Sequence, residues 1–430
     1  MTRREYLVSF GIALATCGVT LGAPRAAHAN GAFPDEFSVH FPPDAPQRIL
    51  VGANFGLLIS EDAGATWRYT CEPWVVAGSN AAVNPEASVS FYQVAADSAL
   101  LASAVNITRS TDGACTWPTA TGLEGQIITD IFASPTDPTL VLAIIAVLNG
   151  SQIAASHDGG KSFGATRLYE TADLLTGVEI ARSDPMVIYA TSVHTSGSSA
   201  TLLRSADRGA TWTPHPIPAD PGTQPRILGV DAADKNIVYL RLLQGLNDAI
   251  GITTDGGQTF TTALNTDGQL TSFLRATDGT LYAGTAAGQL YVRPPGEPNF
   301  AAPRPAPHLR CLGQRAGESK RFYACGDFVL DGYSLFASDD SGRTFMPVMK
   351  FPDIKGPLGC GPVATNCAAH WQRIQGVLGL LPSTDAGQGG GGGAGGSGPA
   401  PKGSCASAGA GATPLLLLVA LLFLRRCAAR

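Results

Sequence analysis

One eight-residue phrase recurs along the chain, and the interval between its copies limits the possible folds more than any other feature. The phrase reads Ser or Thr, any residue, Asp, any residue, Gly, any residue, Ser or Thr, then an aromatic residue. Its copies are SEDAGATW at 60, SHDGGKSF at 156, SADRGATW at 205, TTDGGQTF at 253 and SDDSGRTF at 338, and STDGACTW at 110 differs only in Ala114. Six copies indicate a repeated structural unit.

The spacing of the final aromatic residues gives the number of units. They are 46 to 50 residues apart over the first five copies, whereas 85 residues separate the last two. A degenerate copy, RPPGEPNF at 293–300 with Phe300 in the aromatic position, divides this interval into 40 and 45 residues. A period of this length is typical of repeat architectures. We therefore predict seven units.

The content of a unit indicates the kind of repeat. Short β-rich runs alternate with Asp, Asn and Gly turns, as in residues 226–244 and 270–293. Turn sequences also recur in phase with the phrase: PPDAP at 42, SPTDP at 134, RSDP at 182, AADKN at 232 and ATDG at 276. Three or four short strands per unit predict an all-β, seven-bladed propeller over residues 30–381. We expect residues 37–41 to form the inner strand of the first blade, and residues 371–380 to add a closing strand or to pack across the bottom of the ring.

The phrase resembles the Asp-box, or BNR, repeat of sialidase-like, sortilin-like and photosystem-assembly-factor-like propellers, over roughly residues 33–350. In those families the loop joins the third and fourth strands of a blade, away from the central face. Its Ser and Asp can bond nearby backbone, its Gly can adopt positive φ, and its aromatic ring can be buried. We therefore expect structural roles for the Asp-box residues, which are Asp62, Asp112, Asp158, Asp207, Asp255, Asp340, Trp67, Trp117, Phe163, Trp212, Phe260 and Phe345.

Residues 1–29 have the pattern of an export signal. TRREYL at 2–7 resembles a twin-arginine signal, an apolar stretch follows at 8–21, and Ala27-His28-Ala29 is a small-residue cleavage site. We predict cleavage after Ala29. Cys17 is interpreted as part of the apolar stretch rather than as a lipidation site.

The C-terminal residues predict attachment to the cell surface. Residues 382–403 form a Gly-rich linker, and residues 404–430 contain Cys405, the apolar run LLLLVALLFL at 415–424 and a pair of arginines. This order resembles the C-terminal sorting tail of myxobacterial surface proteins, which implies processing at Cys405. The alternative is a retained transmembrane anchor, because residues 406–424 would span about 28 Å as a helix. Both alternatives predict export to the outer membrane or surface of a Gram-negative cell.

Six cysteines lie in the predicted propeller, an even number that predicts disulfides in an exported domain. Cys311 and Cys325 are expected on neighbouring antiparallel strands. Cys360 and Cys367 are then expected to close a short loop, and Cys71 and Cys115 to link the first two units, although the sequence leaves other pairings open. Their spacings fit neither a zinc site nor a redox motif.

Charge and motifs exclude several functional classes. The chain is acidic overall, with a net charge of −5, and seven of its 29 Lys and Arg residues lie in the two terminal segments. Nucleic-acid binding is therefore not expected. No His spacing indicates a metal site, and no GxSxG, HExxH or phosphate-binding loop is present. We expect no cofactor.

An enzymatic role is tested by the sialidase motifs. Sialidases need an arginine triad, a Tyr nucleophile activated by Glu, and an acidic acid/base residue. The strings QRIL at 47 and PRIL at 225 have Leu where that family has Pro after Arg-Ile. The arginines expected nearest the ring centre are Arg226, Arg241, Arg275 and Arg310.

The sequence therefore favours a non-catalytic binding or interaction module with a glycan or protein ligand. A sialidase-like glycoside hydrolase is the first alternative, and it requires a carboxylate pair or an arginine cluster at the ring centre. An envelope assembly factor with a protein partner is the second alternative, and a purely structural envelope protein is the third.

Overall fold

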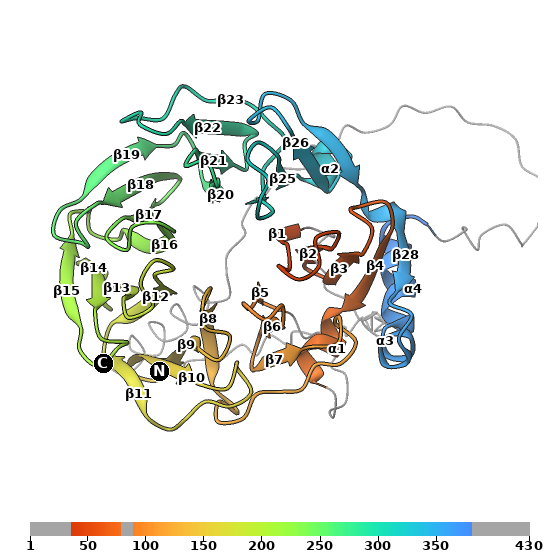
Figure 1. Cartoon of the computed structure of the whole chain (residues 1–430), viewed down its shortest axis with the longest axis horizontal. Helices are drawn as coiled ribbons and strands as arrows, with labels where there is room; N and C mark the ends of the chain where they lie inside the picture. Colours follow the sequence, from red (N-terminus) through yellow and green to blue (C-terminus); the bar gives the residue numbers. More distant parts are fainter. Residues whose placement is uncertain (1–35, 79–88, 381–430) are drawn as a thin grey trace, which may run out of the picture. The chain divides into compact units, whose positions relative to one another are not determined.

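The computed structural model describes residues 36–78 and 89–380, which form seven sheets arranged as the blades of a ring (Figure 1). Consecutive strands within each blade are antiparallel. The predicted all-β, seven-bladed propeller is confirmed. The predicted cleavage site at Ala29, the Gly-rich linker and the segment with Cys405 lie outside the described residues. Within the described ranges, no helix is both long and apolar enough to cross a membrane.

Each blade is a meander of consecutive strands. Blade 1 contains β1 (Glu36–His40), β2 (Ile49–Ala53), β3 (Gly56–Ser60) and β4 (Trp67–Cys71). Blade 2 contains β5 (Phe91–Val94), β6 (Leu100–Ser103) and β7 (Ile107–Ser110). Blade 3 contains β8 (Ile127–Ala133), β9 (Val141–Val147), β10 (Gly150–Ser156) and β11 (Arg167–Thr171). Blade 4 contains β12 (Leu174–Ile180), β13 (Ile188–Val193), β14 (Ala200–Ser205) and β15 (Thr213–Ile217).

The remaining blades follow the same plan. Blade 5 contains β16 (Gln224–Val230), β17 (Val238–Gln244), β18 (Asn247–Thr253) and β19 (Thr261–Asn265). Blade 6 contains β20 (Leu270–Arg275), β21 (Leu281–Thr285), β22 (Gln289–Arg293) and the short β23 (Arg304–Pro305). Blade 7 contains β24 (Cys311–Gly313), β25 (Phe322–Cys325), β26 (Leu335–Ser338) and β27 (Met346–Met349). Three short helices lie in loops: α1 (Glu72–Ala77), α2 (Phe328–Asp331) and the 3₁₀ helix η1 (Phe351–Asp353).

The first strand of each blade lines the central channel, and the later strands follow outward (Figure 1). Strand β1 contacts both β5 and β24, which closes the ring between blades 7 and 1. The apolar core is divided into clusters between neighbouring sheets. One cluster, for example, combines Ile131 of blade 3 with Leu101 of blade 2. Each blade is therefore stabilised by the two beside it.

Each Asp box follows the third strand of its blade and, in blades 1, 3, 4, 5 and 7, leads into the fourth strand. In blade 4 the Asp207 carboxylate accepts hydrogen bonds from the Thr211 backbone N–H at 2.8 Å and from the Thr211 hydroxyl at 2.6 Å. The Ser205 hydroxyl donates to the same carboxylate and accepts the Gly209 N–H, both at 2.8 Å. The Trp212 indole donates to the Gly209 carbonyl at 3.0 Å. These contacts close the turn locally.

The other boxes repeat this geometry, including the one without Gly. Ala114 adopts a φ of 71° and still donates its N–H to the Ser110 hydroxyl at 3.0 Å. The degenerate copy lies between β22 and β23. There Phe300 is half-buried beneath the Arg293 guanidinium, 5.7 Å from the ring centroid. This copy keeps the aromatic side chain and lacks the Asp.

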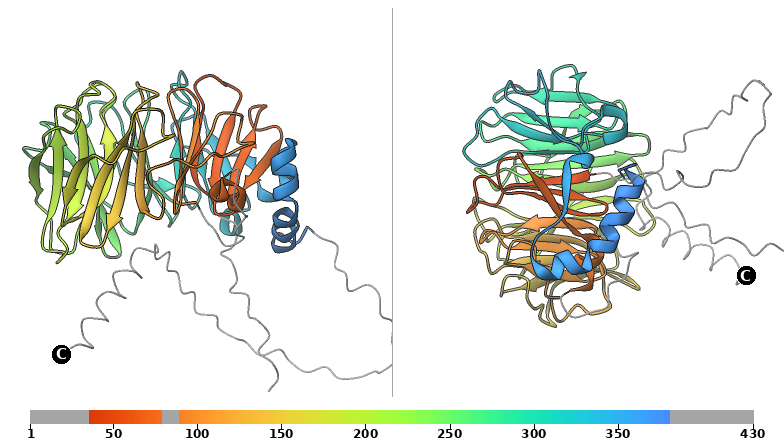
Figure 2. Two further views of the ribbon diagram at one scale, coloured as in Figure 1. Left: turned by 90° about the horizontal axis from the view of Figure 1, so that it is seen from below. Right: turned by 90° about the vertical axis from the view of Figure 1, so that its right-hand side faces the viewer.

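The segment after blade 7 crosses to the outside of blade 1 (Figure 2). Strand β28 (Ile354–Pro357) pairs in parallel with β4, and the Arg68 guanidinium donates to the Pro357 carbonyl at 3.0 Å. Helices α3 (Gly361–Asn366) and α4 (Ala368–Val377) follow. Residues 371–380 therefore lie mostly in a helix and add no strand. Trp371 and Ile374 share one face of α4, and Trp371 packs 5.3 Å from the Tyr69 ring.

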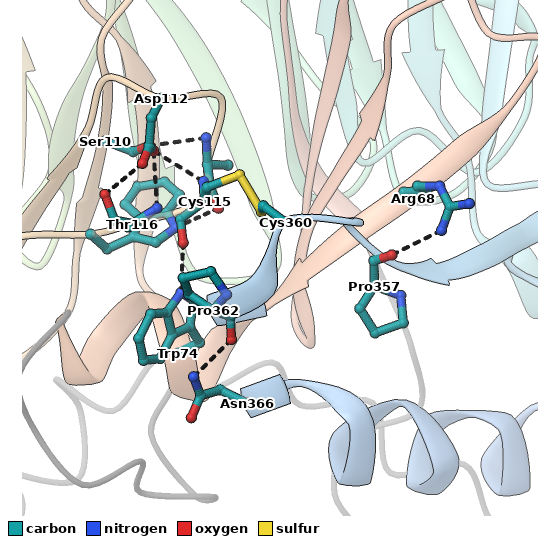
Figure 3. Close-up of a disulfide and its surroundings, with 12 residues drawn as sticks. Arg68, Trp74, Ser110, Asp112, Cys115, Thr116, Pro357, Cys360, Pro362 and Asn366 are labelled. Atoms are coloured by element: carbon teal, nitrogen blue, oxygen red, sulfur yellow. Dashed lines mark hydrogen bonds between the residues drawn. A yellow bond between two sulfur atoms is a disulfide. The ribbon is translucent and has the colours of Figure 1, made fainter. Parts of the chain in front are cut away.

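Three disulfides involve all six propeller cysteines. The predicted pair Cys311–Cys325 joins β24 and β25 and is confirmed. The other two pairings are wrong, because the structure contains Cys71–Cys367 instead. The remaining bond is Cys115–Cys360, which Figure 3 shows. Residues 360 and 367 flank a helix, which separates them by about 10 Å, too far for a disulfide. Cys71 is the last residue of β4 in blade 1, at the end of the strand away from its Asp box. Cys115 lies in the Asp box of blade 2, which follows β7.

Candidate functional site

Polar side chains on the channel wall join the inner strands of blades 2 to 5. Gln93 of β5 accepts the Ala133 N–H and donates to the Ile131 carbonyl, both at 2.7 Å. Asp130 of β8 accepts the Val178 N–H at 3.0 Å. Glu179 of β12 accepts the Val230 N–H at 2.9 Å. Each side chain therefore binds the backbone of the next blade.

Bulges in the inner strands help to aim these groups. The pairing register shifts beside Asp130 in β8, and equivalent shifts occur in β12, β16 and β20. An extra residue at a bulge redirects its side chain. Thr176 at the β12 bulge donates to the Pro225 carbonyl of blade 5, and Thr271 at the β20 bulge donates to the Leu309 carbonyl before blade 7.

The two channel carboxyl groups have perturbed acidity. Burial raises the pKa of Asp130 to about 7, although the Val178 N–H and the Arg226 charge act in the opposite direction. Burial also raises the pKa of Glu179 to about 7, and the nearby Asp130 charge adds to this effect. Both groups therefore change protonation near neutral pH. Carboxyl groups whose pKa is shifted by burial in this way are candidates for a functional site.

The four arginines expected near the centre do not converge on one point. The Arg241 guanidinium pairs with Asp248 at 2.7 Å. Arg310 pairs with Asp327 at 2.7 Å, and Arg275 pairs with Asp231. Among the described residues, only Arg226 of these four makes no hydrogen bond or ion pair, and it faces Arg241 across the β16–β17 register. An arginine triad is therefore not assembled in the described part of the chain.

Sequence reasoning did not single out Asp130 or Glu179. The available signal was a carboxyl residue inside an apolar inner strand, as in IITDIFA of β8 and LLTGVEI of β12. That signal needs the strand to be assigned to the channel wall first. No group of three His, Cys, Asp or Glu side chains in the described ranges is arranged to hold a metal ion.

No protein-family model matches the chain, and no curated protein sequence matches it. Solved structures do resemble it. YCF48 from Cyanidioschyzon merolae is 13% identical with a TM-score of 0.51, over 72% of this chain and 97% of that protein. The likeness is one of fold.

Two further structures resemble the chain more weakly. PorZ of Porphyromonas gingivalis, a surface component of the type-IX secretion system, is 15% identical with a TM-score of 0.49, over 74% of this chain and 38% of PorZ. The GH74 xyloglucanase from Xanthomonas campestris is 13% identical with a TM-score of 0.37, over 72% of this chain and 77% of the enzyme. None of the three comparisons identifies a function.

Proposed function

We propose that the protein is an exported, surface-anchored Asp-box propeller that acts as a non-catalytic binding or interaction module. Its three disulfides indicate an extracytoplasmic location. The attachment to the surface rests on the C-terminal sequence with Cys405. Membrane fractionation of cells producing a Cys405→Ala variant tests it, with release from the membrane fraction as the expected result.

One observation supports binding over catalysis. Three polar groups of the channel wall, Gln93, Asp130 and Glu179, bond to the backbone of the neighbouring blade. Three of the four central arginines are neutralised by carboxylates. A sialidase-type site needs these groups free to contact a substrate carboxylate and a reacting sugar. The geometry therefore favours a scaffold with ligand contacts on its surface.

A glycoside hydrolase is the second candidate, and the carboxyl pair supports it. Glycosidases use two carboxyl groups, one with a raised pKa, and burial raises the pKa of Asp130 and of Glu179 to about 7. The alternative also needs substrate to reach both groups within the channel.

A panel of fluorogenic glycosides, together with a glycan array, distinguishes the two candidates. We expect no turnover by the wild-type protein. Turnover that is lost in both the Asp130→Asn and the Glu179→Gln variants would replace the binding proposal with the hydrolase. An Asp255→Asn variant, changed in an Asp box, is the matched control for damage to the fold.

A further inference from the structure

Apolar side chains project into solvent from one face of the propeller. We define the hairpin face as the edge with the turns between second and third strands and the connections between blades. Val105, Leu148 and Leu246 occupy such turns in blades 2, 3 and 5 and are 70%, 87% and 85% exposed. Val329 and Leu330 in α2 of blade 7 are 65% and 63% exposed.

The turns themselves do not require these apolar residues. In blade 5, Gly245 supplies the positive φ of 81°, so the neighbouring Leu246 position accepts any polar residue. Single exposed apolar residues are common, but here they recur on one face in four of the seven blades, which makes this face a candidate interaction surface. Ile127, at the start of β8, adds another exposed side chain to the same face.

The charges of the two faces differ as well. Exposed Lys and Arg residues among the described ranges lie on the Asp-box face or the outer rim: Lys161, Arg182, Arg208, Lys320, Arg343, Arg68, Lys355 and Arg373. The hairpin face has no exposed Lys or Arg among its described residues, but it has three exposed acids in its blade connections, Glu124, Asp220 and Asp267. None of the three forms an ion pair with a described residue. The Asp-box face also has exposed acids, such as Asp62, Asp112 and Asp158, so the two faces differ in their basic residues.

We propose that the hairpin face docks a polypeptide partner whose apolar side chains are flanked by Lys or Arg. The exposed Leu and Val side chains match the apolar part of such a partner, and the acids without an ion-pair partner match its charges. A membrane surface fits less well, because bilayer-binding faces combine apolar residues with Lys or Arg rather than with acids. This proposal rests on the proposed binding function and names the surface and partner chemistry.

Two synthetic 18-residue amphipathic peptides test the proposal, one built from Leu and Lys and the other from Leu and Glu. Binding to the full-length protein is measured by fluorescence anisotropy. We expect the Leu/Lys peptide to bind at least tenfold more tightly than the Leu/Glu peptide. The Leu148→Ser/Leu246→Ser variant should bind the Leu/Lys peptide at least tenfold more weakly than the wild type does.

The matched control is Met186→Ser/Met346→Ser, which removes the exposed apolar side chains of the Asp-box face. It should bind the Leu/Lys peptide as the wild type does. Equal losses in both double variants, or no preference between the peptides, would overturn the proposal. Thermal melts check that every variant is folded.

Other occupants give different results. Sedimentation velocity that shows self-association, abolished by Leu148→Ser/Leu246→Ser, would assign the face to a second copy and overturn the proposal. Binding to neutral phosphatidylcholine vesicles with the same dependence would assign it to lipid. If the peptides fail but the glycan array gives a ligand, the binding function stands and only the hairpin-face assignment is lost.

Discussion

The two faces of the propeller differ in how regular their turns are. The Asp-box turns repeat one hydrogen-bond pattern, with Asp62, Asp158 and Asp340 bonded as Asp207 is. The hairpin turns differ in length and sequence from blade to blade, and they expose Leu148 and Leu246. The repeated residues therefore mark the turn that six of the seven blades share. Residues that vary and are exposed at an energetic cost are the better indicators of function.

The largest effect on stability is expected when a buried Asp-box ring is removed. Trp67 is 2% exposed and its indole donates to the Gly64 carbonyl at 3.0 Å. Trp67→Ala should lower the free energy of unfolding by about 3–5 kcal/mol, because it leaves a cavity and an unpaired carbonyl. Urea unfolding measures the change. A loss below about 1 kcal/mol would contradict a structural role for the box aromatics.

The disulfides test how firmly the segment after blade 7 is held against blade 1. The Cys71–Cys367 bond closes a sequence separation of 296 residues, whereas Cys311–Cys325 spans 14. Cys71→Ser/Cys367→Ser should cost about 2–5 kcal/mol of unfolding free energy, and more than Cys311→Ser/Cys325→Ser, because longer loops gain more chain entropy when cut. Paired urea titrations compare the two variants. Equal losses would mean that loop length does not govern the effect.

Acid titration tests the Asp-box carboxylates. Hydrogen bonds from the Thr211 hydroxyl and N–H lower the pKa of Asp207 to about 2. Its contribution to stability is therefore present above the unfolded pKa of about 4 and is lost as the pH falls towards 2. The Asp207→Asn variant should lose less stability than the wild type between pH 4 and pH 2, as measured by thermal melts. An identical pH dependence would contradict this prediction.

The smallest effect is expected on the hairpin face. Leu148 is 87% exposed, so Leu148→Ser should change the free energy of unfolding by less than about 0.5 kcal/mol. The same urea titration measures it. A larger loss would show that the hairpin turns also stabilise the fold, and the contrast between the faces would disappear.

The sequence predicted the ring because its evidence is local and periodic. Each Asp box bonds within itself, so Asp207 and Trp212 are recognisable without knowledge of distant residues. Asp130 and Glu179 were not predicted as a site, because their partners Val178 and Val230 lie about 50 residues away in the next blade. The predicted pairing of Cys71, Cys115, Cys360 and Cys367 was wrong for a related reason. Their geometry depends on the path of β28 and α3 around blade 1.

The segment of β28, α3 and α4 on the outside of blade 1 also determines where a mechanical force on the C-terminal part of the chain would enter the fold. The described chain ends at Leu380, just after α4, and the anchor proposed from the sequence lies beyond that point. Tension along the chain would first reach α4 and then Cys367, whose disulfide passes it to Cys71 at the end of β4. Blade 7 would be shielded from that force. A force applied through the proposed anchor would thus load the Cys71–Cys367 bond before it could separate a β-strand from its sheet.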